Sequence, residues 1–475
     1  MKNGNYYGID FGTTNTSVFL YKCVSGELAK SAKFGTDGKD IYPFSSCIAI
    51  SKNYVADIKF GKEVKDHINE LANDYRIITS FKSFLGTDKE IEVAGERFNG
   101  KKLVSIFLKY VKKVVNEDDF TEAIFSIPVD FSSDARRDLL EAAEAADIKV
   151  KGFVSESSSA YISKIMDIKA YSKVLVIDWG GGTLDLSILK LKENKIYEDA
   201  VYGAKYGGDD IDKELAERIS PKVFQNESFE SLDPSKKDRL MRNIEQMKIA
   251  FSSSDDDYNV ILGKDSKLFS MDYESFNDII YFLITNNVIK PILDFMSKNN
   301  ITPESIDAVI LAGGSSQIRT FADYIKELFG EDRIIFDDEY QWMVAKGAAL
   351  TSVINCEFKL SDDVSVLLSD NETFPIFKKD IDGVGSESNE ITFSLVDDSS
   401  DAHFIFTDSK GKNKYGRISV RTKGYYDEKI VLKAKINKDQ IARISISNSS
   451  ISSDYKEEIE LNKLKFYYDL SSLEE

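Results

Sequence analysis

The chain has 475 residues, of which 80 are acidic and 62 basic, so its formal net charge is −18 at pH 7. This charge argues against a nucleic-acid partner, which would need basic stripes that the sequence does not contain. The three cysteines lie far apart with no Cys-x-x-Cys spacing, and there are only two histidines. We therefore expect no disulfide framework, no zinc cluster and no histidine-based catalytic triad.

Length and apolar content set the expected organisation and location. An apolar content of 42% over 475 residues predicts two to four compact units. The first five residues lack the apolar core of a targeting signal. The apolar run 279–293 is interrupted by Asn286, Asn287 and Pro291 and is shorter than a bilayer span. We therefore expect a cytoplasmic protein with no membrane partner.

The first predicted element is a hairpin whose turn has the composition of an anion site. Residues 6–9 and 17–21 are apolar and predict two strands, and Asp10 ends the first. The residues between them are Gly12, Thr13, Thr14 and Asn15. Glycine lets the backbone approach an anion, the threonines add donors, and Asp10 can hold a hydrated divalent cation. Taken alone, the stretch also fits an ordinary hairpin.

The same plan occurs a second time, which favours the anion site. Residues 174–189 repeat the order of apolar strand, aspartate, aromatic, glycine-rich turn and apolar strand. In this second hairpin, Asp178 precedes a turn that contains Gly180, Gly181, Gly182 and Thr183. Two such hairpins predict two similar half-domains that face one nucleotide with a metal ion between them. The role of Asp185 is left open between a cation contact and a turn cap.

We expect further helices and strands in each of the two predicted halves. In residues 1–170 we expect strands near 47–50, 54–58 and 123–127, and helices from Lys62 and over 103–115, 134–146 and 157–165. In residues 171–355 we expect a mostly helical insert over 209–294, with a small hairpin at 258–270. A third glycine-rich turn, Gly313, Gly314 and Ser315, joins the strand 306–312 to the helix 319–329. A closing helix over 342–354 carries small residues at 347–349, which predicts close packing.

Beyond residue 355 the pattern changes to short alternating segments, which predicts an all-β domain over residues 369–475. The expected strands are 390–395, 403–406, 417–421, 429–436, 441–446 and 457–461. Residues 356–368 are expected to be a linker region, although 363–368 also fits the first strand of the β-domain.

Taken in order, these motifs resemble the actin-like ATPase superfamily and, within it, the Hsp70 (heat-shock 70) chaperones. The likeness covers residues 1 to about 355. It rests on the two hairpins, residues 312–316, the lysine segment 81–86, the Pro128 segment followed by Arg136, Glu156, and residues 206–209. The resemblance implies an actin-like (ribonuclease H-like) α/β fold of two lobes, followed by a small all-β sandwich. It also implies ATP hydrolysis to ADP and phosphate.

The resemblance further implies site roles and ligands. Lys82, Glu156, Thr183, Asp10 and Asp178 would be catalytic, and Asp10 and Asp178 would hold Mg²⁺ through water. ATP or ADP would be bound by the turn residues named above and by Gly207, Gly208, Asp209, Glu245, Lys248 and Ser252. K⁺ is a second cation that the resemblance allows. From the residues alone, Lys82 also fits a surface lysine.

Departures from the family pattern change some of these expectations. Ile249 and Gln317 stand where the family stacks the adenine between two arginines. Losing such stacking removes roughly 1 kcal/mol or more per contact, which predicts weaker adenosine binding or looser base choice. Gly152 replaces an arginine that the family uses to engage J-domain partners. The chain ends at Glu475 directly after the β region, so we expect no helical lid and fast release of any bound peptide.

Three classes of function follow from these residues. The leading one is an Hsp70-like chaperone whose β-domain binds an unfolded polypeptide or a specific client under the control of ATP, with a nucleotide-exchange factor as a further partner. The second is an actin-like filament-forming ATPase, which would normally lack a large C-terminal β-domain. The third is a sugar or acyl kinase, which would need an acceptor pocket between the lobes. A protein kinase is excluded because no His-Arg-Asp loop is present.

Overall fold

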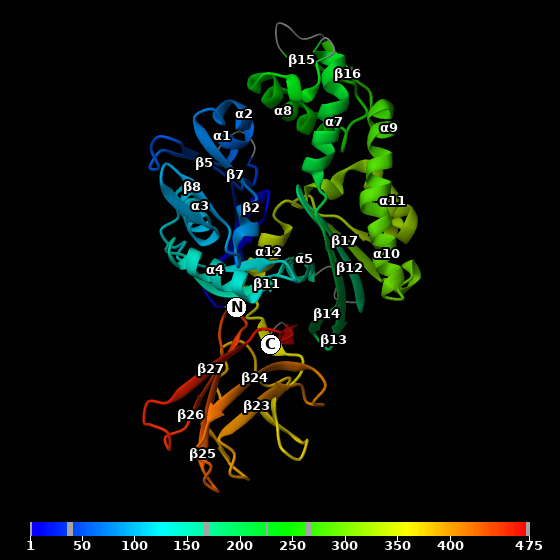
Figure 1. Ribbon diagram of the computed structural model, residues 1–475. Coiled ribbons are helices and arrows are strands. Elements are labelled where there is room, and N and C mark those ends of the chain that lie inside the picture. Colours follow the sequence, from blue (N-terminus) through cyan, green and yellow to red (C-terminus); the bar gives the residue numbers. More distant parts are fainter. Residues whose placement is uncertain (1, 36–40, 166–170, 225–226, 263–267, 472–475) are drawn as a thin grey trace. The chain divides into compact units, whose positions relative to one another are not determined.

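The computed structural model describes residues 2–35, 41–165, 171–224, 227–262 and 268–471 (Figure 1). The chain forms two compact units. The first contains the residues up to Leu191 together with Glu198–Val353, and the second contains Lys192–Tyr197 together with the residues from Ile354 onward.

The first sheet is built around the N-terminal hairpin. Strand β1 (Gly4–Phe11) is antiparallel to β2 (Asn15–Val24) and parallel to β10 (Glu122–Ile127). The sheet order is β11-β10-β1-β2-β3, with β11 at Lys149–Ser155, β3 at Glu27–Phe34 and the short β4 (Phe44–Ser45) beside β2.

Side chains alternate between the two faces of β1. Tyr7, Ile9 and Phe11 are buried in the core that includes helices α3 (Gly100–Val115) and α4 (Ser133–Glu144). Gly8 points the other way, where an added Cβ would lie 2.1 Å from the carbonyl oxygen of Ala345 in helix α12 (Met343–Val353). Helix α12 was expected in the second half of the domain, but it packs on β1 and on α5 (Glu156–Ser163).

The second sheet repeats this plan around the second hairpin. Strand β12 (Lys173–Trp179) is antiparallel to β13 (Leu184–Lys192) and parallel to β17 (Ala308–Ala312). Strand β14 (Lys195–Ala204) lies beside β13, and β18 (Ile334–Ile335) beside β17. A core of apolar residues joins this sheet to helices α7 (Gly208–Val223) and α11 (Arg319–Phe329). The expected duplication is thus visible in the pairing of the strands.

The first unit contains two further, smaller groups of elements. One comprises β5 (Cys47–Ser51), β6 (Ile58–Phe60), β7 (Tyr75–Thr79), and helices α1 (Gly61–Asp66) and α2 (Ile68–Leu71). The other is the predicted helical insert, with α8 (Pro234–Ala250), β15 (Tyr258–Ile261), β16 (Leu268–Met271) and α9 (Tyr273–Ile284). The tip of the β15–β16 hairpin, residues 263–267, lies outside the described residues.

The apolar run 279–293 lies within one continuous helix, in the insert that was expected to be mostly helical. Helix α9 continues through a π-helical turn at Thr285–Ile289 into α10 (Lys290–Lys298). Within that turn Asn286 donates its amide hydrogen to the carbonyl oxygen of Phe282 at 2.9 Å, so the asparagine is accommodated without ending the helix. The helix Tyr273–Lys298 is 26 residues long and, by length and composition alone, could cross a membrane. A buried core helix passes the same test, and 44% of the most apolar window of this helix is buried.

The second unit contains two four-stranded sheets, as the alternating pattern predicted. One has the order β21-β20-β23-β24 and the other β22-β25-β26-β27. Their bounds are β20 Val364–Leu367, β21 Thr373–Phe377, β22 Ile391–Ser394, β23 Asp401–Thr407, β24 Lys414–Arg421, β25 Lys429–Ile436, β26 Ala442–Ser447 and β27 Lys456–Leu461. Apolar residues of both sheets share one core, which makes the unit a sandwich.

The segment 356–368, expected as a linker or a first strand, forms two strands of the second unit. Strand β19 (Glu357–Leu360) pairs with β28 (Phe466–Asp469), and β20 pairs with β21 and β23. β28 also pairs with Lys195 and Ile196 of β14, which is why Lys192–Tyr197 belongs to this unit.

Candidate functional site

Both hairpin turns line one cavity of the first unit, with a volume of about 670 Å³. The predicted residues that line it are Asp10, Gly12, Thr13, Thr14, Asn15, Lys82, Glu156, Asp178, Gly180, Gly181, Gly182, Thr183, Gly208, Asp209, Glu245, Lys248, Ser252, Gly313, Gly314 and Ser315. Gly207 is not in the lining but lies directly behind it, because a Cβ there would be 2.2 Å from the carbonyl oxygen of Gly181. Residues that are far apart in the chain therefore converge on one polar cavity.

The first turn is held by Ser46, which precedes β5. Its hydroxyl donates to the carbonyl oxygen of Gly12 at 2.9 Å, and its backbone N–H donates to the carbonyl oxygen of Thr14 at 2.8 Å. These contacts occupy the carbonyl groups of Gly12 and Thr14, and the Thr14 hydroxyl donates to Oδ2 of Asp209 at 3.2 Å.

The second turn is held by its own backbone and by the N-terminus of α7. The backbone N–H of Gly180 donates to the carbonyl oxygen of Thr183 at 2.9 Å. The N–H groups of Gly208 and Asp209 donate to the carbonyl oxygens of Gly180 and Gly181 at 3.1 and 2.8 Å. The N-terminus of a 16-residue helix therefore begins at the wall of the cavity, where its dipole favours negative charge.

The third turn contacts the second turn directly. The hydroxyl of Ser315 donates to the carbonyl oxygen of Gly180 at 2.8 Å. Gly313 has a φ of +78°, and a Cβ there would lie 2.6 Å from Oδ1 of Asp178. Glycine is therefore required at this position by both the backbone conformation and the carboxylate beside it.

Lys82 and Glu156 form a buried ion pair at the cavity. Lys82 lies in the short 3₁₀ helix Phe81–Phe84, and Glu156 is the first residue of α5. The Nζ of Lys82 donates to Oε1 of Glu156 at 2.8 Å, and the two side chains are 6% and 12% exposed. Burial alone would lower the pKa of Lys82, but the charges of Glu156 and Asp10 raise it overall. Lys82 therefore stays charged and is not a surface lysine.

Three aspartates of the cavity lining, Asp10, Asp178 and Asp185, interact electrostatically with this pair. Burial and the charge of Glu156 raise the pKa of Asp10 to about 6, although its hydrogen bond from Ser126 opposes the shift. Burial and Glu156 raise the pKa of Asp185 to about 7, and the pKa of Asp178 is also raised, by burial and by the neighbouring carboxylates. A cation among these groups would relieve their mutual repulsion.

The donor set suits a hydrated magnesium ion. Carboxylate oxygens are preferred by Mg²⁺, which usually keeps several waters and adds phosphate oxygens. Over the described residues, no group of three or more His, Cys, Asp or Glu side chains is close enough to ligate a metal directly. The residues present therefore fit an ion held through water.

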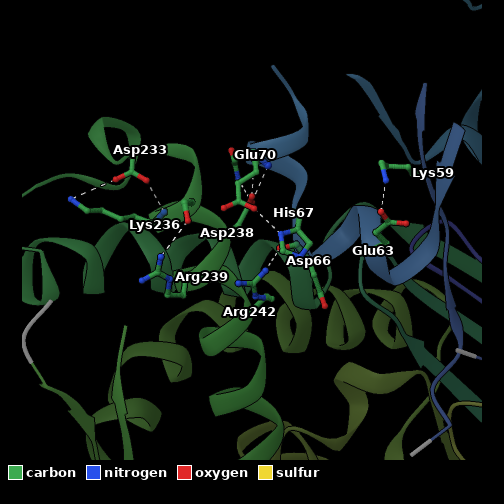
Figure 2. A network of polar contacts seen from close by, with 12 residues as sticks. Lys59, Glu63, Asp66, His67, Glu70, Asp233, Lys236, Asp238, Arg239 and Arg242 are labelled. Atoms are coloured by element: carbon green, nitrogen blue, oxygen red, sulfur yellow. Dashed lines mark hydrogen bonds and ion pairs between the residues drawn. The ribbon is translucent and has the colours of Figure 1, made fainter. Parts of the chain in front are cut away.

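Contacts between α1, α2 and α8 bridge the two sides of the cavity. Lys65 of α1 donates to Oε1 of Glu245 in α8 at 2.6 Å. The carboxylate of Asp238 accepts hydrogen bonds from the backbone N–H groups of Asn69 and Glu70, both at 2.9 Å, and from the Asn69 side chain at 2.6 Å. Arg242 donates to the carbonyl oxygen of Asp66. Figure 2 shows Asp238 and Arg242 of α8 beside Glu70 and Asp66.

The end of the cavity where the sequence predicted a base is apolar and aromatic. Ile249 lines the cavity and is 53% exposed, and Tyr340 and Ile318 line it too. Gln317 is not in the lining, and its side-chain amide donates to the hydroxyl of Ser316 at 3.2 Å. Arg242 is also among the lining residues, and its guanidinium donates to the carbonyl oxygen of Asp66.

Several lining residues were not predicted. Lys65 lies in a polar helix, and nothing in that pattern distinguishes it from a solvated lysine. Tyr42, Tyr340 and Gln341 lie outside any glycine-rich motif. Asp185, whose role was left open, also lines the cavity. Its position opposite Asp178 in the β12–β13 register was a usable signal, because residues paired across a hairpin share a face.

These features describe a mixed α/β protein in which two similar hairpins line the same polar cavity. The family model for "Hsp70 protein" matches residues 46–380 of the chain. The chain belongs to the Hsp70 family.

Two curated relatives are chaperone proteins DnaK. The one from Thermosipho melanesiensis is 29% identical over 371 residues, which cover 73% of this chain and 59% of the relative. The one from Thermosipho africanus is 29% identical over 371 residues, covering 73% of this chain and 58% of the relative. The match thus spans less than two thirds of each relative's length.

Proposed function

We propose that this chain binds ATP with Mg²⁺ in the cavity and hydrolyses it to ADP and phosphate. The observation that carries the proposal is the buried Lys82–Glu156 pair, which lies beside three carboxylates and between two glycine-rich turns. Phosphoryl transfer of this kind needs charge neutralisation and a positioned water more than a strong base.

The roles follow from the chemistry of each group. The turn amides and Thr13, Thr14 and Thr183 would bind the phosphate oxygens. Asp10 and Asp178 would hold Mg²⁺ through water, and the ion would neutralise charge on the phosphates. Lys82 would stabilise the negative charge that develops on the transferred phosphoryl group and orient the attacking water, because its position is fixed by Glu156.

We also propose that the ATPase controls how the β-sandwich of the second unit holds an unfolded polypeptide, as a cytoplasmic chaperone. Support comes from membership of the family, from the printed names of the relatives and from the two-sheet second unit. A nucleotide-exchange factor would act on the contacts between α1, α2 and α8. The glycine at position 152 argues against stimulation by a J-domain protein.

The test combines turnover with sedimentation. ATP hydrolysis is measured with and without an unfolded polypeptide, and the protein is centrifuged in ATP. Stimulation without pelleting supports the chaperone. Pelleting that depends on ATP would indicate a filament, and release of ADP that depends on a sugar would indicate a kinase.

A substitution at Lys82 tests the catalytic assignment. Lys82→Ala should lower kcat by about 100-fold or more, since it removes the cation from the site, while the Kd for ADP changes only a few-fold. The matched control is Lys101→Ala, because Lys101 also pairs with a glutamate, Glu141, but is 40% exposed. If both variants keep the wild-type kcat, Lys82 has no part in the reaction.

A further inference from the structure

The loop between β18 and α12, residues 336–342, brings a tyrosine to the third turn of the cavity. Tyr340 is half-buried and lines the cavity. A Cβ added to Gly314 would lie 4.0 Å from Cε2 of the tyrosine ring. Apart from the turn itself, no other atom of the described residues lies within 4 Å of that Cβ position. The space beside this turn is therefore bounded by the tyrosine ring and otherwise open to a ligand.

Asp337 fixes the start of this loop. Its side chain is 5% exposed, and its Oδ2 pairs with Nζ of Lys164, the C-cap residue of α5, at 2.8 Å. Its Oδ1 accepts the backbone N–H of Glu339 at 2.7 Å. Its carbonyl oxygen accepts the backbone N–H of Tyr340 at 3.0 Å. One buried residue therefore holds the backbone that leads into the tyrosine.

The end of the loop is fixed by an aromatic residue and a second ion pair. Trp342 is 5% exposed and belongs to a small apolar core with Phe19 of β2. Its backbone N–H donates to the carbonyl oxygen of Glu339 at 2.7 Å, and the carboxylate of Glu339 pairs with Lys33 of β3 at 3.0 Å. Because the backbone on both sides of Tyr340 is already held, little conformational entropy is lost when a ligand stacks on its ring.

The surrounding groups indicate which part of a nucleotide would meet this ring. The first and second turns offer donors to phosphate oxygens, and Glu245 and Lys248 of α8 offer polar groups to sugar hydroxyls. The lining also contains Ile249 and Ile318, whose side chains have no polar atom. The base is the planar part of a nucleotide, and it stacks readily on aromatic side chains.

We propose that the base of the bound nucleotide stacks on the ring of Tyr340, and that the loop anchored by Asp337 and Glu339 positions this ring. The inference rests on the proposed nucleotide binding and goes beyond it, because it assigns recognition of the base to a residue outside the glycine-rich turns. Tyr340 acts on the base and not on the phosphates, so the two contributions to affinity can be measured separately.

The first experiment measures the Kd of ATP and of inorganic tripolyphosphate, each with Mg²⁺, for the full chain by calorimetric titration. Tyr340→Ala should weaken ATP binding about ten-fold or more, because the stacking surface is lost, and should change the Kd of tripolyphosphate by less than about two-fold. Tyr340→Phe keeps the ring and should bind ATP as the wild-type protein does. The matched control is Tyr54→Ala, because Tyr54 is 66% exposed and is not among the lining residues.

Several results would overturn the assignment of Tyr340. Unchanged ATP affinity in Tyr340→Ala would do so, and so would an equal loss of affinity for ATP and tripolyphosphate, which indicates a general structural defect. Tyr42 also lines the cavity, and a loss of ATP affinity in Tyr42→Ala alone would assign the stacking to that residue instead. A wild-type protein that binds tripolyphosphate but not ATP would contradict only the stacking. One that binds neither ligand would sink the proposed nucleotide binding itself.

A double-mutant cycle tests the role of the loop. Asp337→Ala removes the partner of Lys164 and the acceptor of the Glu339 N–H, so it should weaken ATP binding about three- to ten-fold and leave tripolyphosphate binding unchanged. In the Tyr340→Ala background, the same substitution should have no further effect. Asp337→Asn keeps an acceptor for the N–H and should restore most of the affinity.

Additive effects of Asp337→Ala and Tyr340→Ala would show that the loop does not position the ring. If Asp337→Ala does not fold, Glu339→Ala makes the same test at a side chain that is 35% exposed. It should weaken ATP binding in the wild-type background and have no effect in the Tyr340→Ala background. Equal losses in both backgrounds would again overturn the positioning role.

Discussion

At the scale of single residues, the main feature is a set of carboxylates placed where their charges repel. Asp10, Asp178 and Asp185 face the same cavity as Glu156, and all three have a raised pKa. A carboxylate whose folded-state pKa is raised binds more protons in the folded than in the unfolded state at intermediate pH. Its charged form therefore opposes folding, and a site of this kind is expected to be stabilised by a bound cation.

This arrangement predicts a pH-dependent stability without ligand. Asp185 has an ordinary value of 3.8 and a folded pKa of about 7, so the stability of the nucleotide-free protein should fall as pH rises from about 4 to 7. Asp185→Asn should raise the free energy of unfolding by about 1–3 kcal/mol at pH 7.5 and by less at pH 5. Thermal unfolding at both pH values, without Mg²⁺ or nucleotide, measures the difference. An equal change in the free energy of unfolding at both pH values would contradict the raised pKa of Asp185.

A second residue-scale prediction concerns the nucleotide base. With Ile249 and Tyr340 in the lining and the Arg242 guanidinium bonded to the carbonyl oxygen of Asp66, selectivity between bases should be weak. A competition titration of ATP against GTP should give Kd values within about ten-fold, because the stacking of a base on apolar and aromatic groups tolerates any base. Ile249→Arg should tighten adenosine binding by about 1 kcal/mol through cation–π stacking. Strict adenine selectivity in the wild-type protein would refute this prediction.

At the scale of elements, the contact of α1 and α2 with α8 should control nucleotide release. Asp238→Ala removes the acceptor of three hydrogen bonds and leaves the backbone N–H groups of Asn69 and Glu70 without their partner. Release of a fluorescent ADP analogue, followed by stopped flow, should accelerate about ten-fold, in line with a loss of about 1.4 kcal/mol from the closed state.

The same helix offers a control for this prediction. Asp233 caps α8 and pairs with Lys236, away from α1 and α2. Asp233→Ala should cost about 1 kcal/mol of helix stability without accelerating release. If the two variants release the analogue equally fast, the effect comes from α8 itself and not from the bridge over the cavity (Figure 2).

Sequence and structure agree best for elements with a strong local pattern. The helix predicted at 103–115 is α3, and the strand predicted at 123–127 is β10, each within a few residues. Strands β19, β21 and β28 were not predicted, because each is only four or five residues long and takes its partners from distant segments. The run 279–293 was expected within a mostly helical insert, but the π-helical turn at Thr285–Ile289 could not be inferred from the sequence pattern.

At the scale of the whole molecule, the two units should respond separately to nucleotide. Each has its own apolar core, so we expect two unfolding transitions by calorimetry. ADP with Mg²⁺ at 100 times its Kd should stabilise the transition of the first unit by about 2.7 kcal/mol and leave the other nearly unchanged. Equal shifts of both transitions would show that the units unfold as one body, and no shift would count against nucleotide binding.

Three features could be inferred from the sequence alone: the glycine-rich turns, the aspartates that end their strands, and the alternating pattern of the β unit. Each depends on residues that are close together in the chain. The tertiary structure alone decided which side chains meet. Lys65 with Glu245, Asp238 with Asn69, and Glu198 with Ser155 are pairs joined by folding across long separations. Their individual residues are ordinary polar side chains, and only tertiary packing brings them within hydrogen-bonding distance.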